Sequence, residues 1–172
     1  GILHITLAFV NPGDEVLVPN PGYPTYTSLS KILGAKVVNY NLDEDNGWQP
    51  DFEELEHRDL SRVKLMWTNY PNMPTGGDAR METYRKLVDF ARRHDIVVVN
   101  DNPYSFILNE HPLSLLQMEG AKDCCIELNS MSKGYNMPGW RVGMCVSNPQ
   151  FISWILKIKS NIDSGTFRGL QL

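Results

Sequence analysis

The stretch METYRKLVDFARRHDIVVVN at residues 81–100 decides the fold class of this chain. Its first part predicts an amphipathic helix over residues 81–94, because Tyr84, Leu87 and Ala91 share one face while arginines occupy the other. Its second part is a continuous apolar run, which is typical of a strand buried on both faces of a sheet. A helix that leads into such a strand favours an α/β fold with a mainly parallel sheet.

The same alternation of helix and strand extends along the chain in both directions. Gly34 closes one of the expected helices as a C-terminal cap. The pattern predicts βαβ units that form a three-layer αβα domain, with helices on both faces of the sheet. Further helices are expected over residues 1–10, 23–33, 51–56 and 151–162, and strands over residues 15–19, 35–40, 63–69, 124–129 and 142–146.

Composition is ordinary for a globular protein and excludes several classes of function. The 172 residues are 42% hydrophobic and 21% charged, with a net charge of −4 and no basic cluster. We therefore expect no nucleic-acid or membrane partner. The three cysteines and four histidines show no metal-ligand spacing, so we expect no metal and a reduced, cytoplasmic protein.

Polar and aromatic residues follow four of the expected strands. Residues 69–76, residues 101–104 and residues 130–133 each come directly after a strand, and Tyr23 follows another across a short turn. In open parallel sheets, ligands bind beyond the carboxyl ends of the strands. The sequence therefore predicts that these four segments meet in one crevice.

The segment SMSKGYNMPGWRVG at residues 130–143 places Lys133 between two serines and an arginine. Such a lysine can hold an aldehyde cofactor as a Schiff base, while Ser130, Ser132 and Arg141 can hold the phosphate of that cofactor. Read by itself, the segment is equally consistent with a solvated lysine in a glycine-rich turn. The residues at the other strand ends favour the first interpretation.

Pyridoxal phosphate also needs a carboxylate at its ring nitrogen, a donor to its phenolate oxygen and a flat group on its ring. Asp101, Tyr104 and Tyr23 are of the right types to serve these three needs. Each also has an ordinary structural interpretation, as a turn aspartate, a half-buried tyrosine and a packing residue. The four segments together, in this order, favour the cofactor site.

These motifs resemble those of the class I/II aminotransferases, the fold-type I enzymes dependent on pyridoxal phosphate. The resemblance covers essentially all 172 residues, and the chain looks like the large, cofactor-binding domain of such an enzyme. The residues that carry it are the Schiff-base signature at 130–143, the D-x-x-Y at 101–104 and the sequence NYPNMPTG at 69–76, which resembles N-P-x-N-P-T-G.

The resemblance implies a transfer of an amino group from an amino acid to a 2-oxo acid, in a homodimer. Lys133 would form the Schiff base and shuttle the proton. Asp101 would pair with the pyridinium and Tyr104 would bind the phenolate oxygen. Tyr23 would stack on the ring. The phosphate would be bound by Ser130, Ser132 and Arg141.

The chain departs from the family pattern in two respects. Met73 stands where the family has an asparagine that also touches the phenolate oxygen, and we expect Asn72 to take over that contact. Family members are roughly twice as long or more. We expect the N-terminal segment, with its phosphate loop and first strand, and the C-terminal small domain, with its substrate-binding arginine, to be missing from residues 1–172. The 172 residues alone are therefore expected to be inactive.

Two other functions remain open at this point. A carbon–sulfur lyase of the same fold would use the same cofactor residues, and a sensor or dimerisation module could retain Lys133, Asp101 and Tyr104 without catalysis. Aspartate, alanine, aromatic amino acids and diaminopimelate all remain open as the amino donor.

Overall fold

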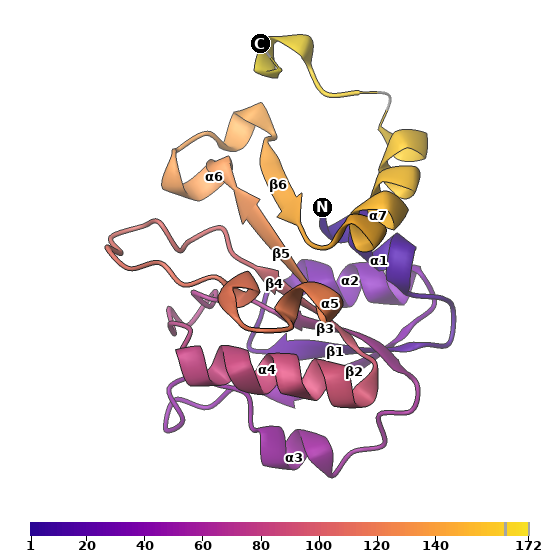
Figure 1. Cartoon of the computed structure of the whole chain (residues 1–172), viewed down its shortest axis with the longest axis vertical. Helices are drawn as coiled ribbons and strands as arrows, with labels where there is room; N and C mark the ends of the chain where they lie inside the picture. The colour runs from indigo at the N-terminus through magenta and orange to yellow at the C-terminus, as the bar shows by residue number, and fades with distance from the viewer. Residues whose placement is uncertain (164, 172) are drawn as a thin grey trace.

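The fold is built around one six-stranded sheet (Figure 1). The computed structural model describes residues 1–163 and 165–171. Strand order in the sheet is β2-β1-β3-β4-β5-β6, and all neighbours are parallel except β5 and β6. This confirms the prediction of a mainly parallel sheet. The strands are β1 (Glu15–Asn20), β2 (Lys36–Asn41), β3 (Val63–Thr68), β4 (Val97–Asp101), β5 (Cys125–Ser130) and β6 (Gly143–Val146).

The expected helices are all present, with bounds within two residues of those predicted. Two single-turn α-helices and three short 3₁₀ helices were not predicted, because segments of three or four residues carry no readable helical period. The α-helices are α1 (Ile2–Phe9), α2 (Pro24–Ile32), α3 (Phe52–Glu56), α4 (Met81–His94), α5 (Ala121–Cys124), α6 (Met131–Gly134) and α7 (Pro149–Ile162). The 3₁₀ helices are η1 (Leu115–Gln117), η2 (Pro138–Trp140) and η3 (Arg168–Leu170).

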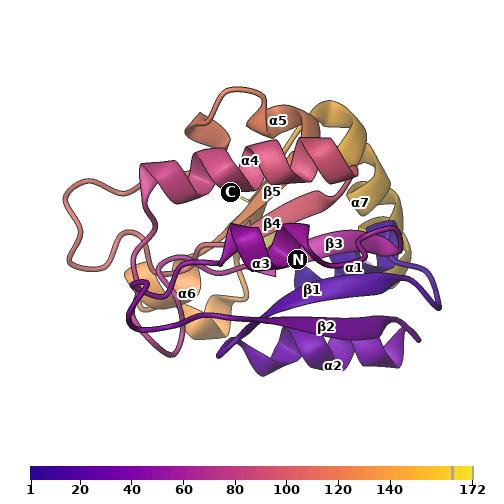
Figure 2. The ribbon, with the colours of Figure 1, turned by 90° about the horizontal axis from the view of Figure 1, so that it is seen from below.

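The sheet separates two hydrophobic cores, which makes the three layers. On one face, Ile5 of α1, Tyr26 of α2 and Ile155 of α7 pack against Leu65 and Trp67 of β3. The other face is covered by α3, α4 and α5 (Figure 2), and its core is assembled by the alternate residues of the strands. The three-layer αβα arrangement predicted from the sequence is thereby confirmed.

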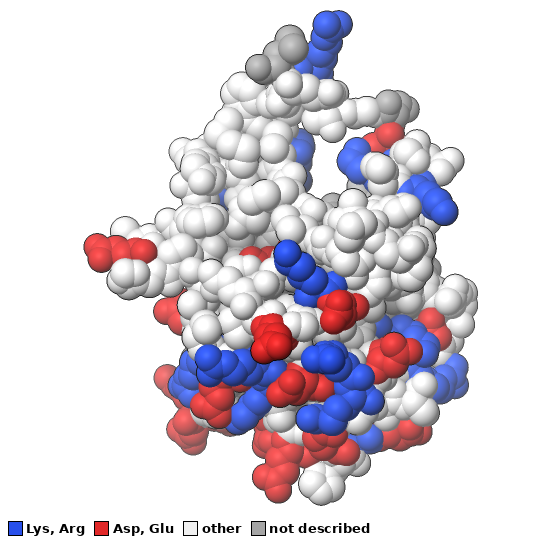
Figure 3. Space-filling model, viewed as in Figure 1, with Lys and Arg blue, Asp and Glu red and all other residues white. Residues whose placement is uncertain are grey.

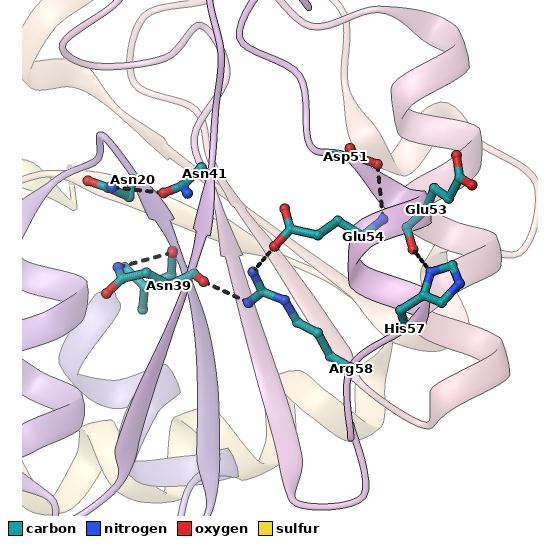
Figure 4. A network of polar contacts seen from close by, with 9 residues as sticks. Asn20, Asn39, Asn41, Asp51, Glu53, Glu54, His57 and Arg58 are labelled. Carbon is teal, nitrogen blue, oxygen red and sulfur yellow. Dashed lines mark hydrogen bonds and ion pairs between the residues drawn. The ribbon is translucent and has the colours of Figure 1, made fainter.

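The edge strand β2 is fixed to α3 by a short polar network (Figure 4). Arg58 donates to the carbonyl oxygen of Asn39 at 2.7 Å and pairs with the carboxylate of Glu54 at 2.5 Å. Asp51 caps α3 by accepting from the Glu54 amide at 3.0 Å. Since an edge strand presents unpaired backbone groups, this network stabilises the sheet at its free side.

None of the helices in the described residues is long and apolar enough to cross a membrane. Within the same residues, no three histidine, cysteine or acidic side chains gather where a metal ion would be held.

Candidate active site

An open cleft of about 1450 Å³ lies beyond the carboxyl ends of the parallel strands. The loops and helices that follow β1, β3, β4 and β5 all contribute to its walls, as expected for an open α/β sheet. Seven of the eight predicted cofactor residues line it, while Asn72 does not. The seven are Tyr23, Asp101, Tyr104, Ser130, Ser132, Lys133 and Arg141.

Lys133 reaches the cleft because a single helical turn follows β5. The side chain of Ser130, the last residue of β5, caps that turn by accepting from the Ser132 amide at 3.1 Å. The Lys133 amine makes no hydrogen bond or ion pair with any residue that the structure describes, and its side chain is exposed. An amine without an internal partner is available to react with a ligand in the cleft.

Asp101 ends β4 and turns its carboxylate toward α2. Its Oδ2 accepts a hydrogen bond of 2.8 Å from the hydroxyl of Tyr26, and Asn69 donates to its backbone oxygen at 2.6 Å. Burial raises the pKa of the Asp101 carboxyl, although the Tyr26 hydrogen bond works in the opposite direction. A carboxylate held in this way is ready to pair with a cationic ligand atom.

Two tyrosines border the cleft near Asp101. Tyr23 is the N-cap residue of α2 and is 40% exposed, and its ring meets that of Tyr26 edge-on at 5.6 Å between ring centroids. Tyr104 follows Asp101 by three residues, and burial raises the pKa of its hydroxyl, with a further contribution from the charge of Asp101. The hydroxyl therefore stays protonated near neutral pH and can donate a hydrogen bond.

Arg141 lines the cleft from the turn between η2 and β6. Its backbone adopts the left-handed conformation with φ of 55°, and its Nη1 donates to the carbonyl oxygen of Pro138 at 2.7 Å. Other donors of the guanidinium remain for a ligand. Nearby, a side chain at Gly143 would put its Cβ 2.6 Å from the carbonyl oxygen of Asn129, so the antiparallel pairing of β6 with β5 requires glycine there.

Asn72 is not among the residues that line the cleft. Asn72 is buried, and its Oδ1 accepts a hydrogen bond of 2.7 Å from the Thr75 hydroxyl within the loop. Met73 and Asn69 line the cleft instead. Asn69 Oδ1 accepts from the Met73 amide at 2.8 Å and so fixes this loop to β3. The geometry therefore does not favour the sequence-based assignment of Asn72 to the cofactor.

The sequence profile of the family described as aminotransferase class I and II matches residues 1–168. The chain belongs to this family. An LL-diaminopimelate aminotransferase of Aquifex aeolicus is 44% identical over 99% of the chain, and that of Halothermothrix orenii is 44% identical over the same share. The chain spans 45% and 44% of these two relatives, which is less than half of their length.

Two solved structures, one of them an aspartate aminotransferase, have the same fold. Apo-BacF from Bacillus superimposes with a TM-score of 0.95 at 40% identity, covering 99% of this chain and 44% of its own. Aspartate aminotransferase from Thermus thermophilus with maleate gives a TM-score of 0.86 at 28% identity, over 93% of this chain and 42% of its own. The fold is therefore that of part of an aminotransferase large domain.

The family implies pyridoxal phosphate as cofactor, and the groups around this cleft fit it by their chemistry. Lys133 supplies an amine without a partner among the described residues, and Asp101 supplies a partly buried carboxylate. Tyr23 offers an exposed ring face. Hydroxyls and a guanidinium, the groups that bind phosphate, stand around the same opening at Ser132 and Arg141.

Two residues of the site were missed by the sequence interpretation. Tyr26 follows Tyr23 by three residues, so both lie on one side of the first turn of α2, a spacing that is readable from the sequence. Asn69 directly follows β3, where the polar segment of that strand end was noted without a role for this residue. The contacts of Tyr26 and Asn69 with Asp101 depend on which segments lie beside β4, and the sequence pattern does not show this.

Proposed function

We propose that these residues form the cofactor-binding large domain of a pyridoxal-phosphate-dependent aminotransferase, which moves an amino group from an amino acid to a 2-oxo acid. The observation that carries this proposal is the convergence of Lys133, Asp101 and Tyr104 on one cleft from the ends of two neighbouring strands, β4 and β5. The chain spans less than half of the length of its relatives, and we propose that further parts of the protein complete the site. By resemblance to the family, we also propose that the protein acts as a homodimer in the cytoplasm.

The roles of the side chains follow from their chemistry. When bound, the cofactor supplies an electron sink for the electrons released at the substrate Cα. Lys133 would hold the cofactor covalently, and its amine, once displaced by the amine of the substrate, would be free to move a proton at the substrate Cα. Asp101 pairs with the protonated ring nitrogen, and Tyr104 donates to the phenolate oxygen. The cationic fork of Arg141 binds phosphate together with the hydroxyls of Ser130 and Ser132.

Lysine labelling tests the assignment directly. The natural full-length protein is incubated with pyridoxal phosphate, reduced with borohydride and digested, and the peptides are mapped by mass spectrometry. We expect the pyridoxyl group on Lys133. Lys122, an exposed lysine of α5, serves as the internal control and should remain unlabelled. Label confined to another lysine, or a folded protein without label, contradicts the proposal.

We further propose a diaminopimelate as the amino donor, because the two curated relatives described above are named LL-diaminopimelate aminotransferases. Substrate recognition depends on parts of the protein beyond these residues, so the test uses the full-length protein. LL-diaminopimelate, aspartate, alanine and aromatic amino acids are compared as donors to 2-oxoglutarate and pyruvate. The largest kcat/KM is expected for LL-diaminopimelate. Release of ammonia and a 2-oxo acid from a sulfur-containing donor, without an acceptor, would instead identify a lyase.

A further inference from the structure

Tyr26 is a buried residue of α2 whose hydroxyl ends at the candidate site. Its side chain is 1% exposed, and the hydroxyl donates to Asp101 Oδ2 at 2.8 Å across 75 positions of sequence. Within the described residues, no other side chain donates to the Asp101 carboxylate. A partly buried carboxylate with a single side-chain donor takes its orientation from that donor.

The ring of Tyr26 is itself held on two sides. It stacks on Trp67 of β3 with 4.8 Å between centroids and an interplanar angle of 6°, and Tyr23 meets it edge-on at 81°. Trp67 is fully buried in the core of that face. These contacts fix the ring, so the hydroxyl has one direction in which to donate.

Tyr26 therefore connects two groups that would face the same cofactor ring. It touches Tyr23, whose ring lines the cleft, and Asp101, whose carboxylate lines the same cleft. An ordinary core tyrosine needs only a satisfied hydroxyl, and any carbonyl oxygen would serve that purpose. Tyr26 instead donates to the carboxylate of Asp101, a candidate cofactor residue, and this favours a role for Tyr26 beyond packing.

We propose that Tyr26 is a positioning residue, which holds the Asp101 carboxylate and the Tyr23 ring in the mutual orientation that receives the cofactor ring. This inference rests on the proposed function. Tyr26 touches the cofactor only through these two neighbours.

The protonation states are consistent with this role. Burial and the adjacent Asp101 charge raise the pKa of Tyr26 far above its ordinary value, so the hydroxyl stays protonated and can donate near neutral pH. Its hydrogen bond favours the ionised carboxyl of Asp101, against the effect of burial. Loss of the hydroxyl leaves the buried carboxylate without a side-chain donor.

The test compares Tyr26→Phe with Tyr40→Phe in the natural full-length protein. Tyr40 is the matched control, because it is 2% exposed and donates one hydrogen bond of 2.7 Å to the Trp67 carbonyl oxygen, away from the cleft. Both variants lose one buried hydrogen bond and should lose similar stability in urea. Only Tyr26→Phe should weaken pyridoxal phosphate binding, by about tenfold to a hundredfold.

Two further readouts separate positioning from packing. The visible circular dichroism of the bound cofactor reports the orientation of its ring, and it should change in Tyr26→Phe but not in Tyr40→Phe. In an Asp101→Asn background, Tyr26→Phe should have little further effect on cofactor affinity, because the two residues act as one unit. Additive losses would mean that Tyr26 acts independently of Asp101.

The outcomes distinguish this inference from the proposed function. If the unsubstituted protein binds no cofactor at Lys133, the proposed function itself fails. If it binds cofactor and Tyr26→Phe matches Tyr40→Phe in affinity and in circular dichroism, the proposed function stands and the positioning role is overturned.

Discussion

Residues 1–130 and residues 131–171 differ in how they are packed. The first segment contains both hydrophobic cores, whereas Ile155 is the one buried residue among the described residues of the second. Large apolar side chains of the second segment are exposed, among them Trp140, Met144 and Phe167. Figure 3 shows a matching contrast in charge: acidic and basic groups are interspersed over α3 and α4, while the surface around α6 and β6 is mostly uncharged.

The candidate site combines both segments. Asp101, Tyr23 and Tyr104 come from the well-packed segment, while Lys133 and Arg141 come from the exposed one. The well-packed segment can position the cofactor ring, and the exposed segment can react with the ligand. It follows that substitutions in the two segments should affect different quantities.

The largest expected effect is on turnover in the exposed segment. Lys133→Ala should lower the transaminase activity of the full-length protein by about 10,000-fold or more, because it removes both the covalent anchor and the proton carrier. The free energy of unfolding should change by less than about 0.5 kcal/mol, since the side chain is exposed. Lys122→Ala is the control for both measurements and should leave them unchanged. A large stability loss in Lys133→Ala would break the division between the segments.

The next effect is on stability in the packed segment. Phe90 of α4 is fully buried and meets Phe52 of α3 edge-on at 6.2 Å, so Phe90→Ala opens a cavity between these helices. It should lower the free energy of unfolding by about 3–5 kcal/mol in urea denaturation. Phe167→Ala, at a side chain that is 74% exposed, should change it by less than about 0.5 kcal/mol. Equal losses would show that the second segment is packed as tightly as the first.

A smaller loss is expected at Glu127, which ties the loop after β4 to β5. Its buried carboxylate accepts from the Leu115 amide at 2.7 Å, from Asn102 Nδ2 at 3.1 Å and from the Ser114 hydroxyl at 3.0 Å. Glu127→Ala removes the carboxylate that accepts from all three donors and should cost about 2–3 kcal/mol. Faster hydrogen exchange at the Leu115 amide would locate the damage. Glu119→Ala, at an exposed glutamate, is the control. If Glu127→Ala left the free energy of unfolding unchanged, the loop would be held by its apolar contacts.

The parts of this structure that could be predicted are those set by local pattern. The helix at 81–94 has the predicted bounds. Its apolar residues Tyr84, Leu87, Val88 and Ala91 are buried, as their helical spacing indicates. Lys133 and Asp101 were predicted to face one cleft because they lie at or just beyond the carboxyl ends of β5 and β4, and both line that cleft.

What could not be predicted depends on contacts between distant segments. The Tyr26–Asp101 hydrogen bond joins residues on separate strand ends. The side chain of Asn72 accepts a hydrogen bond from Thr75 within its own loop, although the sequence pattern predicted that it contacts the cofactor. The antiparallel direction of β6 likewise depends on where the turn at Arg141 places it. Side-chain partners of this kind are chosen by tertiary packing, which periodicity does not encode.

The smallest effect concerns the charged surface between α3 and α4. Glu56 pairs with Arg93 and accepts from His94 Nε2 at 2.7 Å. Partial burial acts to raise the pKa of Glu56, but the hydrogen bonds from Arg93 and His94 outweigh it and lower that pKa. A lowered carboxyl pKa contributes stability above the unfolded value of about 4.3, and this contribution is lost as pH falls through the folded value.

Glu56→Gln should therefore lose less than about 1 kcal/mol at pH 7, because exposed ion pairs are screened by solvent. The difference between the variant and the unsubstituted protein should vanish as the pH falls from about 5 to 3, and should shrink in 1 M salt. Urea denaturation at a series of pH values measures it, with the exposed Glu53→Gln as control. A loss that persists undiminished at pH 3 would mean that packing, not charge, joins α3 to α4. The charged face of Figure 3 would then contribute nothing electrostatic to the contrast between the two segments.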